Sequence, residues 1–424
     1  MVKKPKILIP IISGGLGLVV FFFYASCGNG TVSSAPRIAQ TSRAPQSIEP
    51  IQQLIAWETK ANVGYFLENE SKVDVASAKV NDNALDLEWL GEPEHHLRTF
   101  VIPEEGMVRW PKHPYNQARS VPFFTAPSDA KLSFEAFFSA SRSLFFFVNG
   151  DAYTIKMPTD RPHKDVVQPT KAEMGKESRL TVPFSQHIAD VDKRFGRSRD
   201  LIVLRDIAMA VEKTTSNGYT IRDLRPLQST GKYYFPGFSF DTMGMAVMKS
   251  CTAKESISRD EFEIFWTKHY SYAAGQAKAT LLLKYGVLQT TPNAQNWLIE
   301  LDPATMCPTG TMVIRDIVDA KPVLPLATAL GYSTFVNEWT QRGGFPRRDI
   351  DIYESNTLWQ SSLENNVRAL AAQRQGFVDG ILKVLGTEDT KTGDRALSES
   401  EAYDSEALAA QSRRILEAMR RGTL

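Results

Sequence analysis

Apolar residues along this chain follow helical spacing near both ends and form short strand-like runs between them. The longest helical pattern runs from Ser258 to Gly286, where aromatic and small apolar residues recur every three or four positions. Ser258 and Glu261 match a capping box at its start, and Gly286 stands where a left-handed C-cap belongs. This pattern predicts one long helix whose apolar stripe packs against the core.

The middle of the chain has the aromatic and β-branched runs that are typical of strands. Between Lys131 and Met157 three such runs follow one another, and Asn149-Gly150 separates the last two as a hairpin turn does. The other predicted elements are strands at 84–89, 98–102, 219–224, 297–301 and 312–314, a helix or strand at 201–212, a loop from Thr159 to Lys176, and helices from Ile51, at 358–385 and at 398–421. Together they predict an α+β fold with mixed or antiparallel sheets and a helical C-terminal part.

Composition divides the chain into four parts. Residues 1–27 predict a signal peptide or membrane anchor, 28–50 a flexible linker, 51–355 one α+β domain, and 356–424 the C-terminal helices. With 424 residues, of which 42% are hydrophobic, the chain can bury a large core. Its formal net charge of +1 gives no sign of a nucleic-acid partner.

The N-terminus has the pattern of an export signal. Lys3, Lys4 and Lys6 precede an uncharged apolar run, 7–25, which lies at the border between a signal peptide and a spanning helix. The lysines should stay in the cytoplasm. Cys27 follows small residues at the end of the run, so we expect a lipidated Cys27 and a folded part that faces the periplasm or the outside of a bacterial cell envelope. A plain signal anchor is the alternative, and both tether the protein to a membrane.

Two further cysteines, Cys251 and Cys307, lie in the predicted folded part. An oxidising compartment would permit a bridge between them. However, Cys251 precedes the long helix and Cys307 follows it, and the ends of a long helix are far apart at about 1.5 Å per residue. We therefore expect two free thiols.

The polar residues after the long helix are the first candidates for chemistry. Asn293 and Asn296 precede the strand 297–301, and Asp316 follows the strand 312–314. Pairing of these strands would bring Asn296 and Asp316 to corresponding ends. Phosphoryl-handling sites use such a pair to hold Mg²⁺ against phosphate oxygens. The alternative is an ordinary hairpin with a polar loop.

Five motifs follow one another along the middle of the chain. They are PKHPYNQ (Pro111–Gln117), SASRSL (Ser139–Leu144), AYTIKMP (Ala152–Pro158), YTIRDLRPL (Tyr219–Leu227), and the segment from TTPNAQN to Arg315-Asp316. In this order they resemble motifs of the NRPS-independent siderophore synthetases, the aerobactin-synthetase family. The resemblance covers roughly residues 108–320 and implies the palm and fingers of those enzymes. Thr291 and Asn293 stand where the family has glutamate and histidine.

The resemblance also implies a site for ATP and Mg²⁺. Its residues would be Arg142, Ser143, Lys156, Asn293, Asn296, Asp316 and His113. The fork of Arg142 and the charge of Lys156 suit phosphate oxygens, and Asn296 and Asp316 are the metal candidates. The alternatives are structural: an arginine that covers a sheet edge, a lysine at a strand end, and a partly buried His113.

The implied function is that of an ATP-dependent carboxylate–amine ligase, which activates a carboxylate such as citrate for siderophore biosynthesis. Two observations oppose it: Thr291 and Asn293 replace family residues of the reaction, and export would place the domain where ATP is scarce. The alternatives are a non-catalytic envelope lipoprotein that binds a polycarboxylate or iron chelate, and a structural lipoprotein with an empty cleft.

His95 and His96 adjoin Glu92 and Glu94 and could form a metal patch. Adjacent residues of a strand point to opposite faces of the sheet. We therefore expect no metal site at this pair.

Overall fold

The computed structural model of the chain describes residues 47–61, 72–91, 94–125, 132–139, 142–159, 171–215, 217–289, 293–317, 319–351, 357–358, 361–386, 402–403 and 405–424, with the backbone alone at 171–177, 351 and 402–403. The chain from Pro45 to Leu424 forms one compact unit. The predicted anchor 1–27, its Cys27 and most of the predicted linker lie outside the described residues.

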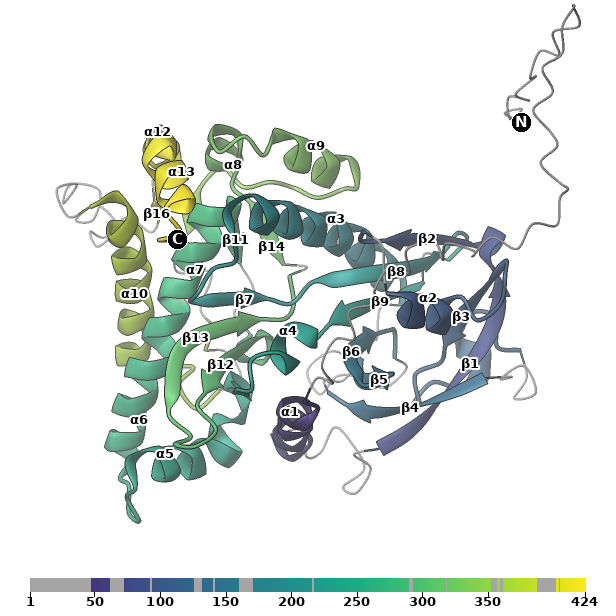
Figure 1. Cartoon of the computed structure of the whole chain (residues 1–424), viewed down its shortest axis with the longest axis horizontal. Helices are drawn as coiled ribbons and strands as arrows, with labels where there is room; N and C mark the ends of the chain where they lie inside the picture. The colour runs from purple at the N-terminus through teal and green to yellow at the C-terminus, as the bar shows by residue number, and fades with distance from the viewer. Residues whose placement is uncertain are drawn as a thin grey trace, which may run out of the picture. The chain divides into compact units, whose positions relative to one another are not determined.

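An antiparallel sheet of eight strands forms the first half of this unit (Figure 1). Its strands, in spatial order, are β2 (Leu85–Trp89), β8 (Asp206–Glu212), β9 (Gly218–Asp223), β6 (Asp151–Lys156), β5 (Ser143–Val148), β4 (Leu132–Phe138), β1 (Lys72–Asn81) and β3 (Met107–Pro111). Asn149 and Gly150 both have positive φ, 53° and 87°, which a two-residue turn between β5 and β6 requires. The predicted hairpin is confirmed.

A smaller sheet of four strands follows. Its strands, in spatial order, are β10 (Tyr233–Pro236), β12 (Trp297–Leu301), β13 (Pro308–Ile314) and β7 (Leu201–Val203), with two-stranded ribbons of β11 (Val287–Gln289) with β14 (Ala320–Pro322) and β15 (Ile350–Asp351) with β16 (Ala402–Tyr403). β7 pairs with β13 in parallel and forms one edge of this sheet. The predicted strands 297–301 and 312–314 are confirmed as the β12–β13 hairpin.

Helices cover both sheets. They are α1 (Glu49–Ala61), α2 (His95–Val101), α3 (Lys171–Phe195), α4 (Arg225–Gln228), α5 (Met245–Thr252), α6 (Arg259–Trp266), α7 (Tyr272–Tyr285), α8 (Leu324–Ala329), α9 (Ser333–Gln341), α10 (Val367–Leu385), α12 (Ser405–Ala410) and α13 (Ser412–Arg420). α7 and α10 run side by side (Figure 1). They approach so closely that a Cβ at Gly275 or Gly376 would lie about 2 Å from the backbone of the other helix.

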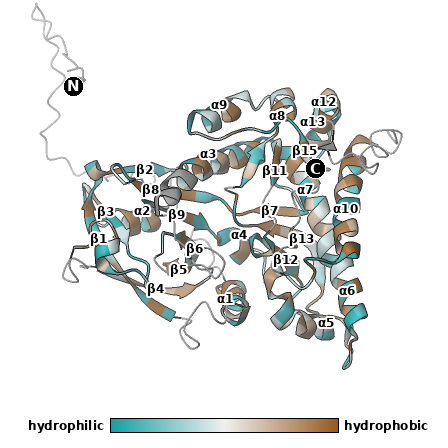
Figure 2. Cartoon of the chain, turned by 180° about the vertical axis from the view of Figure 1, so that it is seen from behind, coloured by the Kyte–Doolittle hydropathy of each residue, from teal (hydrophilic) through white to brown (hydrophobic). Residues whose placement is uncertain are grey.

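A shared core joins the two sheets. Ile51 and Leu54 of α1 pack in one cluster with Phe145 of the large sheet and Leu298 of the small one. Figure 2 shows hydrophobic and hydrophilic residues alternating around the covering helices, as expected for elements with one face on a core and one in water. α1 therefore helps to hold the two sheets together.

The long helical pattern from Ser258 is confirmed with one irregularity. Ser258 and Glu261 form the capping box, and Gly286 has φ 68° in the left-handed region. Between α6 and α7, however, residues Thr267–Ser271 form a π-helical turn, which periodicity alone does not reveal.

Two predicted elements are wrong. Residues 98–102 were expected as a strand, but they belong mostly to α2, whose buried Leu97 and Val101 lie one helical turn apart. The predicted loop from Thr159 to Lys176 ends earlier, because α3 begins at Lys171. α3 contains Pro183, which normally argues against a helix interior, so its pattern is hard to recognise in sequence.

The expectation of two free thiols is also wrong. Cys251 and Cys307 form a disulfide, with their Cα atoms 4.7 Å apart. The chain turns back after Gly286, and the β12–β13 hairpin carries its turn to the far end of the helix, next to α5 (Figure 1). Sequence distance along one helix therefore says nothing about the separation of the two thiols.

Candidate functional site

One face of the large sheet carries a row of polar side chains. Lys156 on β6 lies opposite Ser143 on β5 and opposite Thr220 on β9. The alternating positions Leu144 and Ile155 belong to the apolar core on the other face of the sheet. The polar row therefore faces away from that core, on the side where β8 and β9 are covered by α3.

Lys156 and Asp316 meet across the two sheets. The Lys156 Nζ atom donates to Asp316 Oδ2 at 3.1 Å, although the residues are 160 positions apart. Arg222 lies 3.8 Å from the other carboxylate oxygen of Asp316 and donates to Asp206 Oδ1 at 2.7 Å. Two cations and two carboxylates thus form one network, in which Arg222 and Asp206 are buried and Lys156 and Asp316 are half-buried.

Arg222 keeps the network charged. Burial lowers the pKa of its guanidinium, but the carboxylates of Asp206 and Asp316 outweigh burial and leave that pKa raised. Arg222 is therefore a fixed positive charge next to Asp316. Neither Arg222 nor Asp206 was singled out from the sequence, because only the β8–β9 register places them together.

Arg142 and Ser143 lie at the same end of the polar row. The carbonyl of Arg142 accepts a hydrogen bond of 2.9 Å from the N–H of Met157, directly after Lys156. Ser143 lies opposite Lys156 in the register of β5 and β6. Arg142 and Ser143 are half-buried, and strand pairing holds their backbones beside that of Lys156. Their contacts with phosphate stay a prediction.

Asn293 is the N-cap of a 3-10 turn, η7 (Ala294–Asn296), and Asn296 is the last residue of that turn, directly before β12. The Asn293 side chain accepts from the N–H of Gln295 at 2.8 Å, so its oxygen caps the turn. Asn296 is buried, and its side chain makes no hydrogen bond to the described residues. The backbone carbonyl of Asn296 accepts a hydrogen bond of 3.1 Å from the N–H of Arg315, the residue that precedes Asp316. Joint binding of Mg²⁺ by Asn296 and Asp316 stays a prediction.

Arg315 belongs to a second ion pair, which is buried. Its guanidinium pairs with Glu58 of α1, which is fully buried and accepts a bond of 2.6 Å from the Ser139 hydroxyl. Arg315 Nη2 and Gln289 Oε1 have no partner among the described residues, and Gln289 donates its amide to the carbonyl of Asp316 at 2.9 Å. Buried polar atoms without partners are rare and often face a ligand or water.

His113 is buried near the same strand end. Its Nδ1 accepts from the N–H of Tyr115 at 3.2 Å and lies 3.3 Å from the Thr159 hydroxyl. It lines a small cavity of about 20 Å³ together with Met157 and Pro158. This volume holds a water but no nucleotide base, and a contact of His113 with nucleotide stays a prediction.

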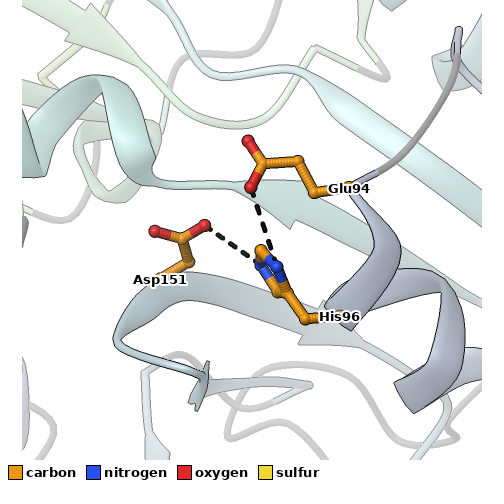
Figure 3. A group of neighbouring side chains, drawn as sticks. All are labelled: Glu94, His96 and Asp151. Atoms are coloured by element: carbon orange, nitrogen blue, oxygen red, sulfur yellow. Dashed lines mark ion pairs between the residues drawn. The ribbon is translucent and has the colours of Figure 1, made fainter. Parts of the chain in front are cut away.

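The reason given for excluding a metal at His95 and His96 is wrong, because both residues lie on α2. Figure 3 shows His96 between Glu94 and Asp151, and its ring nitrogens lie 3.7 Å and 3.1 Å from those carboxylates. Arg225 also pairs with Glu94 and lies 3.8 Å from Asp151. Arg225 already supplies the positive charge, so the group forms an ion-pair network.

Comparison with known proteins identifies the fold. No family model and no curated protein matches the chain. Among solved structures, ATP-bound aerobactin synthetase IucA from Klebsiella pneumoniae aligns over 84% of this chain and 64% of its own, with a TM-score of 0.51 and 16% identity. IucC from the same source aligns over 80% and 70%, with a TM-score of 0.50 and 12% identity. Petrobactin biosynthesis protein AsbB from Bacillus anthracis str. Sterne aligns over 88% and 77%, with a TM-score of 0.54 and 11% identity.

The chain therefore has the fold of siderophore synthetases, which confirms the predicted α+β class and the resemblance in fold. It spans less than two thirds of the length of IucA. Within the described residues, no helix combines the length and the apolar character that crossing a membrane requires.

Lys278 on α7 is a buried titratable group outside the polar network. Its ammonium lies 5.9 Å from the centre of the Trp297 ring and has no hydrogen-bond partner in the described structure. Burial holds the pKa of Lys278 well below its ordinary value of 10.5. Folding therefore makes this amine lose its proton at a lower pH than an exposed lysine would.

The substitution Lys278→Met should stabilise the protein at pH 7, because methionine fills a similar volume without a buried amine. The unfolded wild type binds the extra proton, so wild-type stability rises with pH above the folded-state pKa. The advantage of the variant should shrink by about 1.4 kcal/mol per pH unit up to the ordinary lysine pKa. Denaturant titrations at several pH values measure it. The same change at exposed Lys249 is the control, and equal pH profiles for wild type and Lys278→Met would contradict the prediction.

Proposed function

We propose that this chain is a siderophore-synthetase-like protein that binds ATP and Mg²⁺ and joins a carboxylate substrate to an amine or hydroxyl. The observation that carries the proposal is the ion pair of Lys156 and Asp316, formed by two distant motifs. The fold is shared with a synthetase whose structure contains ATP. Gln289 donates to the Asp316 carbonyl, and its buried Oε1 atom has no partner among the described residues, which supports a ligand there.

The residues present fit a magnesium nucleotide. Asp316 and Asn296 offer the oxygen donors that Mg²⁺ prefers, and Lys156 offers a cation to phosphate oxygens. Lys156 would leave Asp316 to contact phosphate, while the positive charge of Arg222 would stay beside Asp316. Arg142 would bind two phosphate oxygens with its fork. The bound metal would neutralise phosphate charge, so these residues would act mainly by positioning and charge.

A second candidate is a non-catalytic protein that binds a polycarboxylate or an iron chelate. The bond from Gln295 to Asn293 favours it, because the oxygen of Asn293 is engaged in capping the turn. A neutral amide also cannot exchange protons near pH 7 as histidine does. Thr291, the other replacement, lies outside the described residues.

We also propose that the protein is exported and tethered to a bacterial envelope. The disulfide supports this location independently of the N-terminal pattern, because disulfides persist in oxidising compartments. Lipidation at Cys27 predicts that metabolic fatty-acid labelling is lost in Cys27→Ala. Labelling that survives this substitution would exclude Cys27 as the lipid attachment site.

Calorimetry with MgATP tests the nucleotide site. We expect Lys156→Gln to bind MgATP about 10- to 100-fold more weakly, because one charge-assisted contact to phosphate is lost. Lys79→Gln is the matched control, since Lys79 is a strand lysine of the same sheet that pairs with Glu104 at 2.6 Å. Equal affinity of wild type and Lys156→Gln would contradict the nucleotide site.

A measurement of catalytic turnover then distinguishes the two candidate functions. An active ligase should exchange labelled pyrophosphate into ATP when its carboxylate is present, because adenylation is reversible. A binding protein should bind citrate without this exchange. Exchange that is lost in Lys156→Gln and kept in Lys79→Gln would assign the reaction to the polar network.

A further inference from the structure

A second pocket shares no lining residue with the polar network of Lys156, Asp316, Arg222 and Asp206. Its volume is about 430 Å³, within the range of roughly 300–1,000 Å³ that small-molecule sites occupy. The last turn of α3, the edge strand β7 and the residues around α4 line it. Arg205 lines the pocket, whereas the next residue, Asp206, is bound to Arg222 of the polar network.

The charge of this pocket is mainly positive. Lys193, Arg197 and Arg205 all line it, and none of them has an ion-pair partner in the described part of the chain. Asp192 is the carboxylate in the lining, and it is already engaged by Lys284 at 3.3 Å and by the Tyr285 hydroxyl at 2.7 Å. Three cations thus share one hollow with a single carboxylate, and that carboxylate is engaged by Lys284 and Tyr285.

This arrangement has an energetic cost that a ligand would offset. Burial lowers the pKa of Arg205. The carboxylates of Asp223 and Asp192 raise that pKa, the charges of Arg197 and Arg225 lower it, and the net direction is downward. A lysine in the last turn of a helix is expected from the helix dipole, which accounts for Lys193. The dipole does not account for Arg197 and Arg205, which lie beyond the end of α3.

We propose that this pocket binds a small organic polyanion with at least two carboxylate or phosphate groups. Two arginines can each bind two oxygens of such a group with their planar forks. The hydroxyls of Ser229 and Thr230 also line the pocket, but they already donate to the carbonyls of Pro226 and Leu227, so the arginines carry the recognition. The lining of this pocket includes neither Lys156 nor Asp316, so the proposed site is a different one from the nucleotide site.

Calorimetry on the full chain tests the proposal with citrate as the carboxylate probe and pyrophosphate as the phosphate probe. We expect at least one probe to bind, and its affinity to fall about tenfold or more in Arg197→Gln and in Arg205→Gln. Arg197 is exposed, so its replacement should leave folding intact. Preference for one probe identifies which acidic group the natural ligand carries.

Two control variants locate the binding. Arg199→Gln makes the same charge change on a neighbouring residue that does not line the pocket. Lys156→Gln should lower the affinity of any probe that binds at the nucleotide site instead of this pocket. Loss of affinity only in Arg197→Gln and Arg205→Gln supports the proposal. Absence of binding by both probes, loss only in Lys156→Gln, or equal loss in Arg199→Gln overturns it and leaves the nucleotide site unaffected.

Discussion

Glu58→Ala is expected to lower the free energy of unfolding by about 3–5 kcal/mol, because it leaves a buried arginine charge without a partner. Glu58 is fully buried, pairs with Arg315 and accepts from the Ser139 hydroxyl. The loss should appear as a lower urea midpoint. It should also loosen α1 from the β12–β13 hairpin, because this pair links the two elements.

Glu49→Ala on the same helix is the matched control. Glu49 is exposed and accepts a hydrogen bond from the Tyr233 hydroxyl, so its removal should cost about 1 kcal/mol, well below the loss expected for Glu58→Ala. The double variant Glu58→Leu/Arg315→Met should recover much of the loss, because removing both charges removes the uncompensated one. A Glu58→Ala midpoint equal to that of Glu49→Ala would show that Arg315 finds water or another partner.

Local signals predicted most elements around the site. The Asn149-Gly150 turn, the capping box and the apolar runs 297–301 and 312–314 depend on neighbouring residues alone, and all are confirmed. The meeting of Lys156 and Asp316 is different. It was expected only because two motifs resembled one family, and no periodicity contains that contact.

The partners that complete the network could not be predicted in the same way. Arg222 and Asp206 face each other because of a strand register that shifts near Asp206, and sequence patterns do not specify such irregularities. Glu58 lies in a helix whose other inward positions are apolar, so its burial was unexpected. Buried charges are recognisable only when the tertiary partner, here Arg315, is known.

The second large effect should follow removal of the disulfide. Cys251 and Cys307 are separated by 56 positions, and closing a loop of this length restricts the unfolded chain by about 4 kcal/mol in the loop-entropy model. The double variant Cys251→Ser/Cys307→Ser should therefore unfold at a clearly lower urea concentration than the oxidised wild type. The bond also fixes α5 to the β12–β13 turn, so protease cleavage near this turn should become faster.

Reduction supplies the internal control for this prediction. Dithiothreitol should lower the urea midpoint of the wild type to that of the double variant, and it should leave the midpoint of the variant unchanged. Alkylation before and after reduction should add mass at Cys251 and Cys307 only after reduction. Labelling of both thiols in the unreduced protein would contradict the bridge. It would also remove the support that the disulfide gives to an oxidising location, so the location would then depend on the N-terminal pattern alone.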